Sequence, residues 1–96
     1  MDLLVSYDVT TDDAAGRRRL RRVAKVCVAF GQRVQKSVFE CSVNEMQLEQ
    51  MRDRLVKCID QKRDNLRIYR LVEPRELRVE SYGRDMYVDF GEPLVV

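Results

Sequence analysis

Histidine is absent from this chain, and so is tryptophan. Without histidine there is no Ser-His or Cys-His nucleophile pair and no imidazole ligand for a metal. The three cysteines, Cys27, Cys41 and Cys58, are widely spaced and form no Cys-x-x-Cys pair, which argues against a structural zinc site. We therefore expect buried packing thiols, and any catalysis must use carboxylates, a metal ion, tyrosine, lysine or arginine.

Long apolar runs are also missing, and none approaches the roughly 20 residues that a membrane-spanning helix needs. The first residues show neither the basic start nor the cleavage site of a signal peptide, so we expect a cytoplasmic protein with no membrane partner. A chain of 96 residues is expected to form one domain. A domain this small leaves much of its surface exposed, so a second copy that covers apolar area would stabilise it.

Hydrophobic periodicity and turn signals predict the order β-α-β(β)-α-β-β. Gly31 is expected to end the first helix, and Asn44 with Gln47 forms a capping box that starts the second. The predicted elements are a strand at residues 3–7, a helix at 13–30, a bent strand or tight hairpin at 32–43, a helix that begins after Asn44, a strand at 66–72 and a short strand at 77–82.

This order matches an α+β, ferredoxin-like core of four antiparallel strands with two helices on one face. We assign this domain to residues 1–83. The strand at 77–82 and a C-terminal tail at 84–96 are additional to that core. A tail this apolar should bury against something.

The net charge is only +2, but the charges are unevenly distributed. Eight of the 18 lysine and arginine residues lie within positions 14–39, and none of the 16 acidic residues does. A basic band on an otherwise acidic protein is typical of a polyanion binder. The alternative is a solvated helix face with intrahelical ion pairs, which the lack of acids there weakens. The candidate phosphate-binding residues are Arg17, Arg18, Arg21, Arg22, Lys25, Arg33 and Lys36.

Tyr7 and Asp8 end the first strand, where a carboxylate can meet solvent. Magnesium is typically held by one or two carboxylates, with waters and substrate phosphates completing its six oxygens. One Asp per chain is too few for a strong site, but two symmetry-related copies at a dimer axis would suffice. The alternative is that Asp8 only starts the turn, as Asp often does.

Gln35, Ser37 and Phe39 form a polar and aromatic edge that could stack or hydrogen-bond a base. The interpretation that we favour is an ordinary strand with a core Phe39. We assign Tyr7, Ser37 and Phe39 supporting roles beside the basic band. An RNA-recognition module would show a basic-aromatic pattern on its third strand, and residues 66–72 offer only Tyr69.

Several segments together resemble the CRISPR-associated protein two family, the small partner of the spacer integrase. The run GQRVQKSVFE at residues 31–40 is the most specific of them. The other matching segments are VSYDVT at 5–10, RRVAK at 21–25, LRIY at 66–69 and SYG at 81–83.

The resemblance implies a symmetric homodimer in which the C-terminal strand and tail pack against the partner's sheet, covering an edge that would otherwise invite aggregation. It also implies metal-dependent cleavage of RNA or double-stranded DNA. Asp8 would be the catalytic and metal-binding residue, with Mg²⁺ as the cofactor and Mn²⁺ as the alternative. The same family is described as a non-catalytic bridge between integrase subunits that grips duplex DNA.

Two functions therefore compete, and they can coexist. The first is a dimeric adaptor that binds the DNA backbone and docks integrase subunits, and the second is a hydrolase that uses paired Asp8 carboxylates and Mg²⁺. No second acid, histidine or lysine near Asp8 can be assigned as a general base, so the residues favour binding over catalysis. A small stand-alone RNA-binding module is the third hypothesis, and the missing aromatic pattern argues against it.

Overall fold

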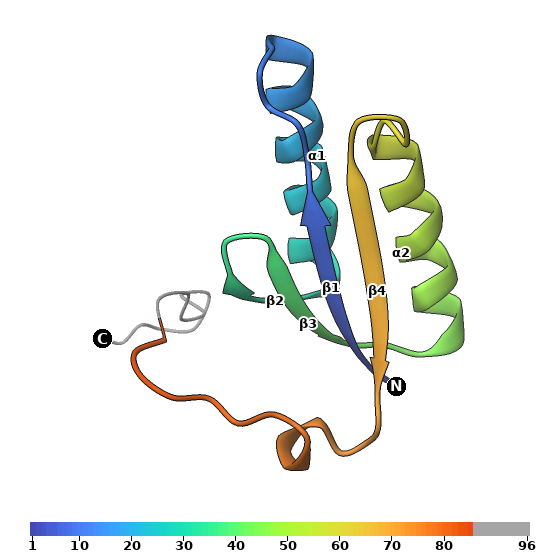
Figure 1. The fold of residues 1–96 in the computed structure, drawn as a ribbon. Helices are drawn as coiled ribbons and strands as arrows, with labels where there is room; N and C mark the ends of the chain where they lie inside the picture. Colours follow the sequence, from blue (N-terminus) through green and yellow to red (C-terminus); the bar gives the residue numbers. More distant parts are fainter. Residues whose placement is uncertain (86–96) are drawn as a thin grey trace.

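The computed structural model describes residues 1–85 and shows a four-stranded sheet with two helices beside it (Figure 1). Its strand order is β2-β3-β1-β4, and every pairing is antiparallel, as the sequence predicts. The elements are β1 (Asp2–Asp8), α1 (Ala14–Phe30), β2 (Gly31–Gln35), β3 (Val38–Ser42), α2 (Glu45–Cys58), β4 (Asn65–Leu71) and the short 3₁₀ helix η1 (Arg75–Leu77).

Both long helices begin where the sequence predicts, and each has a capping residue at its start. The side chain of Asp13 accepts a hydrogen bond of 2.7 Å from the backbone N–H of Gly16 at the start of α1. Asn44 and Gln47 form the predicted capping box at the start of α2. These local hydrogen bonds satisfy amide groups that a helix start leaves without partners.

Gly31 follows the last residue of α1 in an extended conformation, and β3 approaches its backbone closely. A Cβ atom at this position would collide with the Sγ atom of Cys41 and the carbonyl oxygen of Glu40. The chain then enters β2 directly, and residues 31–42 form the tight hairpin of the two predicted alternatives, with a bulge between Arg33 and Gln35.

The core lies between the sheet and the helix layer. The pleat of β1 directs Leu3, Val5 and Tyr7 toward the helices, where α1 and α2 contribute their apolar faces. The fully buried helix residues are Val23, Cys27, Met51 and Leu55, with Leu48 2% exposed.

Two of the three cysteines pack in this core as predicted, while Cys58 is only half-buried. Burial raises the pKa of Cys27 to about 12 and that of Cys41 to about 11. Both thiols are therefore protonated at neutral pH and act as apolar packing groups.

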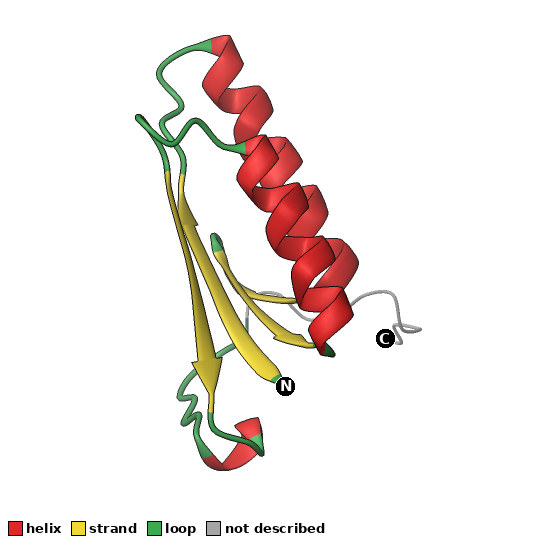
Figure 2. Ribbon diagram, turned by 90° about the vertical axis from the view of Figure 1, so that its right-hand side faces the viewer, coloured by secondary structure: helices red, strands yellow, loops and turns green. Residues whose placement is uncertain are grey.

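Helices cover only one face of the sheet, and the other face is left without a helix layer (Figure 2). The side chains of Leu4, Ser6 and Asp8 alternate with the core residues of β1 and so belong to this uncovered face. Tyr69 of β4, paired with Leu4, lies on it and is 43% exposed.

The strand predicted at residues 77–82 is not formed within this chain. Residues 75–77 form η1, and the backbone from 78 to 85 is irregular, with Leu77 and Tyr82 exposed. A segment whose apolar and polar residues alternate forms a strand only where a neighbouring strand supplies hydrogen bonds. Residues 77–82 pair with neither edge of the sheet. Its pairing with a partner's sheet remains a prediction.

The predicted apolar tail lies almost entirely at residues 86–96, outside the described residues. Among the helices that the structure describes, none is both long and apolar enough to cross a membrane.

Candidate nucleic-acid interface

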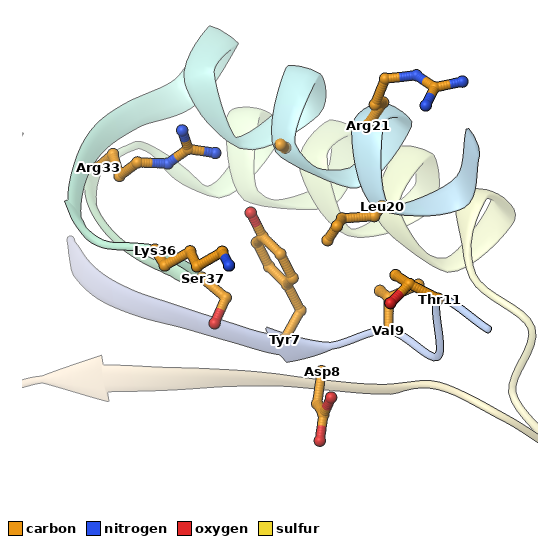
Figure 3. A pocket seen from close by; sticks show the side chains of 10 residues that line it. Tyr7, Asp8, Val9, Thr11, Leu20, Arg21, Arg33, Lys36 and Ser37 are labelled. Atoms are coloured by element: carbon orange, nitrogen blue, oxygen red, sulfur yellow. The ribbon is translucent and has the colours of Figure 1, made fainter. Parts of the chain in front are cut away.

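A hollow of about 440 Å³ opens where the end of β1, the first half of α1 and the β2–β3 turn meet (Figure 3). Its apolar floor is formed by Val9, Leu20 and Ala24. The polar side chains that line it are Tyr7, Thr11, Arg21, Arg33, Lys36 and Ser37. Tyr7 comes from the end of β1, Arg21 from α1, and Arg33, Lys36 and Ser37 from the β2–β3 hairpin. The fold thus brings together segments that are distant in the sequence.

Aromatic packing fixes the inner wall of this hollow. Tyr7 stacks on Phe39 with ring centroids 6.2 Å apart, and the guanidinium carbon of Arg33 lies 5.0 Å from the centroid of the Phe39 ring. The backbone N–H of Tyr7 donates to the carbonyl oxygen of Ser37 at 3.2 Å, which ties the hairpin turn to β1. These contacts hold Arg33 in a defined place beside the hollow.

Phe39 itself is fully buried, which confirms the favoured prediction of a core residue and leaves no surface on which a base could stack. Its supporting role is therefore indirect, since it positions Tyr7 and Arg33. Gln35 is exposed but does not line the hollow.

The Tyr7 hydroxyl is buried, and among the described residues it has no hydrogen-bond partner of standard geometry. Burial raises the pKa of Tyr7, and the neighbouring Arg33 opposes this rise. The hydroxyl is therefore protonated at neutral pH and stays beside the Arg33 side chain at the inner wall of the hollow.

The structure divides the predicted basic band between two sides of α1. Arg21 lines the hollow together with Arg33 and Lys36, whereas Arg22 and Lys25 lie on the side of α1 that faces α2. Arg17 and Arg18 are exposed near the start of the helix and line neither space.

Asp8 does not join this cluster through its carboxylate. Although Asp8 lines the rim of the hollow, its side chain points away from Tyr7 and toward the opposite side of β1 (Figure 3). Asp8 is exposed, as predicted for the end of the strand, and it pairs with Asn65 of β4. One chain thus presents its phosphate-binding candidates and its metal-binding candidate on opposite faces of the sheet.

The fit of this chain to Mg²⁺ is incomplete within one copy. Within residues 1–85 there is no group of three or more His, Cys, Asp or Glu side chains able to hold a metal ion. Asp8 supplies one exposed carboxylate, which suits a magnesium ligand but needs a second carboxylate or substrate phosphates to complete a site. The uncovered face on which it lies is open to such a second contributor.

A buried carboxylate, which the sequence did not reveal, fixes the loop that follows Asp8. Asp64 accepts hydrogen bonds from Arg19 Nε at 2.8 Å, from the Thr10 amide at 3.0 Å and from the Asp60 amide at 2.9 Å. The Thr10 hydroxyl donates to the carbonyl oxygen of Arg63 at 2.7 Å, and Arg63 forms ion pairs with Asp12 and Asp13. The β1–α1 and α2–β4 loops are thereby joined.

This network also explains why Arg19 is not a phosphate-binding residue, although it lies within the basic band. Its guanidinium forms an ion pair with Asp64, whose side chain is fully buried. Sequence alone indicates only a turn at residues 64–65, because nothing in it marks a pairing across 45 positions.

A hollow with three cations above an apolar floor is chemically suited to bind phosphate oxygens. It contains no carboxylate that points inward, so it offers recognition without a general base.

Comparison with known proteins gives the family. A family model described as CRISPR associated protein Cas2 matches residues 1–79. The chain is 58% identical over its full length to the CRISPR-associated endoribonuclease Cas2 1 of Moorella thermoacetica, which it also covers fully. This chain belongs to the Cas2 family.

Other family members agree with this result. The chain is 45% identical to the CRISPR-associated endonuclease Cas2 of Halalkalibacterium halodurans, with 99% of each chain covered. The crystal structure of Streptococcus pyogenes Cas2 superposes with a TM-score of 0.78 at 52% identity, over 86% of this chain and all of that one. The resemblance and the ferredoxin-like fold expected from the sequence are thereby confirmed.

The Asp64 network generates a stability prediction. Burial alone would raise the pKa of Asp64, but hydrogen bonds from Arg19, the Asp60 amide and the Thr10 amide outweigh it and hold the pKa below its usual value. A depressed folded-state pKa stabilises the protein above the ordinary Asp pKa of about 4, and this contribution is lost as the pH falls through the folded pKa. Asp64→Asn should therefore lower the free energy of unfolding by about 2 kcal/mol near neutral pH.

Urea unfolding of both proteins, from about pH 7 down to the lowest pH at which both remain folded, measures this difference. Asp53→Asn is the matched control, because its 3.0 Å ion pair with Lys57 is exposed and its loss should change stability by no more than about 0.5 kcal/mol. A destabilisation by Asp64→Asn that stayed constant across the pH range would contradict this account.

Proposed function

We propose that this protein is a nucleic-acid-binding component of CRISPR spacer acquisition, acting in the cytoplasm as a homodimer together with integrase subunits. The observation that carries the proposal is the convergence of Arg21, Arg33 and Lys36 on one hollow that contains no inward-pointing acid. Guanidinium and ammonium groups in this arrangement suit the oxygens of backbone phosphates, which receive most protein–DNA hydrogen bonds. Family membership supports the CRISPR role, and the integrase partner is what the resemblance of the sequence implies.

The uncovered face of the sheet supports the homodimer. This face carries Leu4, Val38 and the exposed ring of Tyr69. A cavity of about 580 Å³ lies between part of this face and the segment at residues 79–85. A face of this kind can pair with the same face of a second copy about a two-fold axis. The two Asp8 carboxylates would then approach one another from the two chains.

Hydrolysis of RNA or DNA is the second function that we propose, and it depends on that dimer. Relatives named endoribonuclease and endonuclease favour it. Mg²⁺ bound by the two Asp8 carboxylates would shield a scissile phosphate and activate a water molecule; Mn²⁺ can supply the same chemistry. The chain's own contribution is to present Asp8, exposed, at the end of a strand that three other strands and two helices keep rigid.

Binding is tested by replacing the two exposed cations of the hollow, Arg21 and Lys36, with alanine. Arg21→Ala/Lys36→Ala should bind duplex DNA about tenfold more weakly than the unmodified protein at low salt, since two phosphate contacts are lost. Its logarithmic salt dependence should be shallower by up to about 2. Lys62→Ala/Arg78→Ala removes the same charge from exposed positions elsewhere and should bind nearly as the unmodified protein does.

Fluorescence anisotropy with a labelled duplex and with single-stranded RNA of equal length gives both quantities. Preference for the RNA would favour the stand-alone RNA-binding hypothesis. If the unmodified protein neither bound duplex DNA nor copurified with its integrase, the adaptor proposal would be wrong.

The dimer is tested by placing a charge on the uncovered face. Sedimentation velocity should show a species of twice the 11.3 kDa chain mass for the unmodified protein. Tyr69→Lys should shift it to the monomer, because like charges would face each other across the two-fold axis. Met46→Lys, at a side chain 69% exposed on α2, is the control and should remain dimeric. A monomeric unmodified protein would remove the basis for the paired Asp8 site.

Cleavage is tested with Asp8→Asn. We expect cutting that requires Mg²⁺ and stops in a chelator, and a loss of at least about 100-fold in rate for the variant, which removes the metal-binding charge. Because the Asp8 side chain points away from the hollow, the variant should keep its affinity for duplex DNA. Glu49→Gln, an exposed acid on α2, should cut normally. Undiminished cutting by Asp8→Asn would show that the activity has another source.

A further inference from the structure

A second basic space lies between the two helices, on the side of α1 away from the hollow. It is a groove of about 370 Å³ lined by residues from the middle of α1 and the last turns of α2, which run side by side (Figure 1). The residues that line it are Arg22, Lys25, Val26, Arg54, Lys57 and Cys58.

Four of these six side chains are cations and none is an acid. Arg54 lies over the ring of Phe30, with its guanidinium carbon 5.7 Å from the ring centroid, so its head group is held at the groove. Lys57 pairs with Asp53 at 3.0 Å, whereas Arg22 and Lys25 form no ion pair within residues 1–85. Like charges gathered at one surface repel, and a bound anion relieves that repulsion.

The groove and the hollow are separate because they lie on two flanks of the same helix. Arg21 and Arg22 are consecutive and so project about 100° apart around α1, one toward the hollow and the other toward α2. Two cations of the groove, Arg54 and Lys57, come from α2, outside the basic band that the sequence makes evident.

We propose that this inter-helix groove is a second phosphate-binding site, which holds the backbone of the nucleic acid after it passes across α1 from the hollow. The inference rests on the proposed function and adds α2 to the binding surface. The floor of the groove, Val26 and Cys58, is apolar, so the four cations supply its polar contacts, and cations gathered in this way suit the phosphates of a nucleic-acid backbone. The nucleic acid therefore runs over the outer side of the helix layer.

The decisive comparison uses two variants with the same loss of charge. Arg54→Ala/Lys57→Ala removes both cations that α2 contributes to the groove. Arg52→Ala/Lys62→Ala removes two exposed cations that do not line it, the first of them from the same helix. Both variants are measured against a labelled duplex over a series of salt concentrations, and circular dichroism melting confirms that each is folded.

We expect Arg54→Ala/Lys57→Ala to bind about tenfold more weakly and to lose up to about 2 from the salt slope, while Arg52→Ala/Lys62→Ala changes each by much less. Equal weakening in the two variants, or none in the first, would overturn the second site and leave the hollow untouched. If instead the unmodified protein fails to bind any duplex, both this site and the proposed function are wrong. Combining the groove and hollow variants should weaken binding by the product of the separate effects, because the two sites lie on different flanks of α1.

Discussion

The pleat of β1 is the constraint on which the rest of the molecule depends. Because successive side chains of a strand point to opposite faces, Tyr7 must enter the helix side when Asp8 faces the uncovered side. β1 is also a central strand, paired along its length with β3 and β4, so this division is held by hydrogen bonds on both sides. The same strand thereby supplies the wall of a basic hollow on one face and a carboxylate on the other.

This division separates the two proposed activities in space. Phosphate binding belongs to the helix face, where cations from α1 and the β2–β3 hairpin gather without acids among the lining residues that point inward. The proposed metal site lies on the uncovered face, where residues 1–85 of one chain present Asp8 but no group of three or more metal-ligating side chains. A nucleic acid held on the helix face of one chain does not reach the Asp8 carboxylate of that chain through the sheet. On the proposed scheme a single copy can bind nucleic acid, whereas cleavage would require the dimer.

Several charges outside the hollow and the groove are paired, and these pairs fix the ends of β1. Arg19 and Arg63 are engaged by Asp64, Asp12 and Asp13, and these contacts fix the loop between Asp8 and α1. Arg75 lies near Asp2 and Glu40, at 3.6 Å and 3.4 Å, and holds the segment after β4 against the opposite end of β1. Both ends of β1 are thus anchored by ion pairs.

The features that depend on neighbouring residues, namely the helix starts and the order of the strands, were predicted correctly. The helix starts at Asp13 and Asn44 follow from capping residues, and the four-strand order follows from periodicity and turns. The strand at 77–82 was wrong for the single chain because alternation does not supply a pairing partner. The role of Asp64 was not predicted because its main partners, Arg19 and Thr10, lie far away in the sequence. The cations of α2 were not predicted as a binding surface because Glu45, Glu49 and Asp53 lie on the same helix.

The orientation of Asp8 relative to the arginines also required the structure. Alternation places neighbouring side chains on opposite faces, but only the packing of α1 and α2 decides which face becomes the core. The helical band of arginines predicted a polyanion surface, and the structure shows how its residues divide between two flanks of α1.

The most direct test of this account is to map the surface that duplex DNA contacts, by NMR chemical-shift changes in the ¹⁵N-labelled protein during titration with a short duplex in the absence of divalent metal. The account predicts shifts in α1 and the β2–β3 turn, centred on Arg21, Arg33 and Lys36, with Arg67 and Tyr69 of the uncovered face unaffected. Shifts confined to the uncovered face, with α1 silent, would contradict it, because the nucleic acid would then lie on the side of Asp8 and not on the side of the arginines.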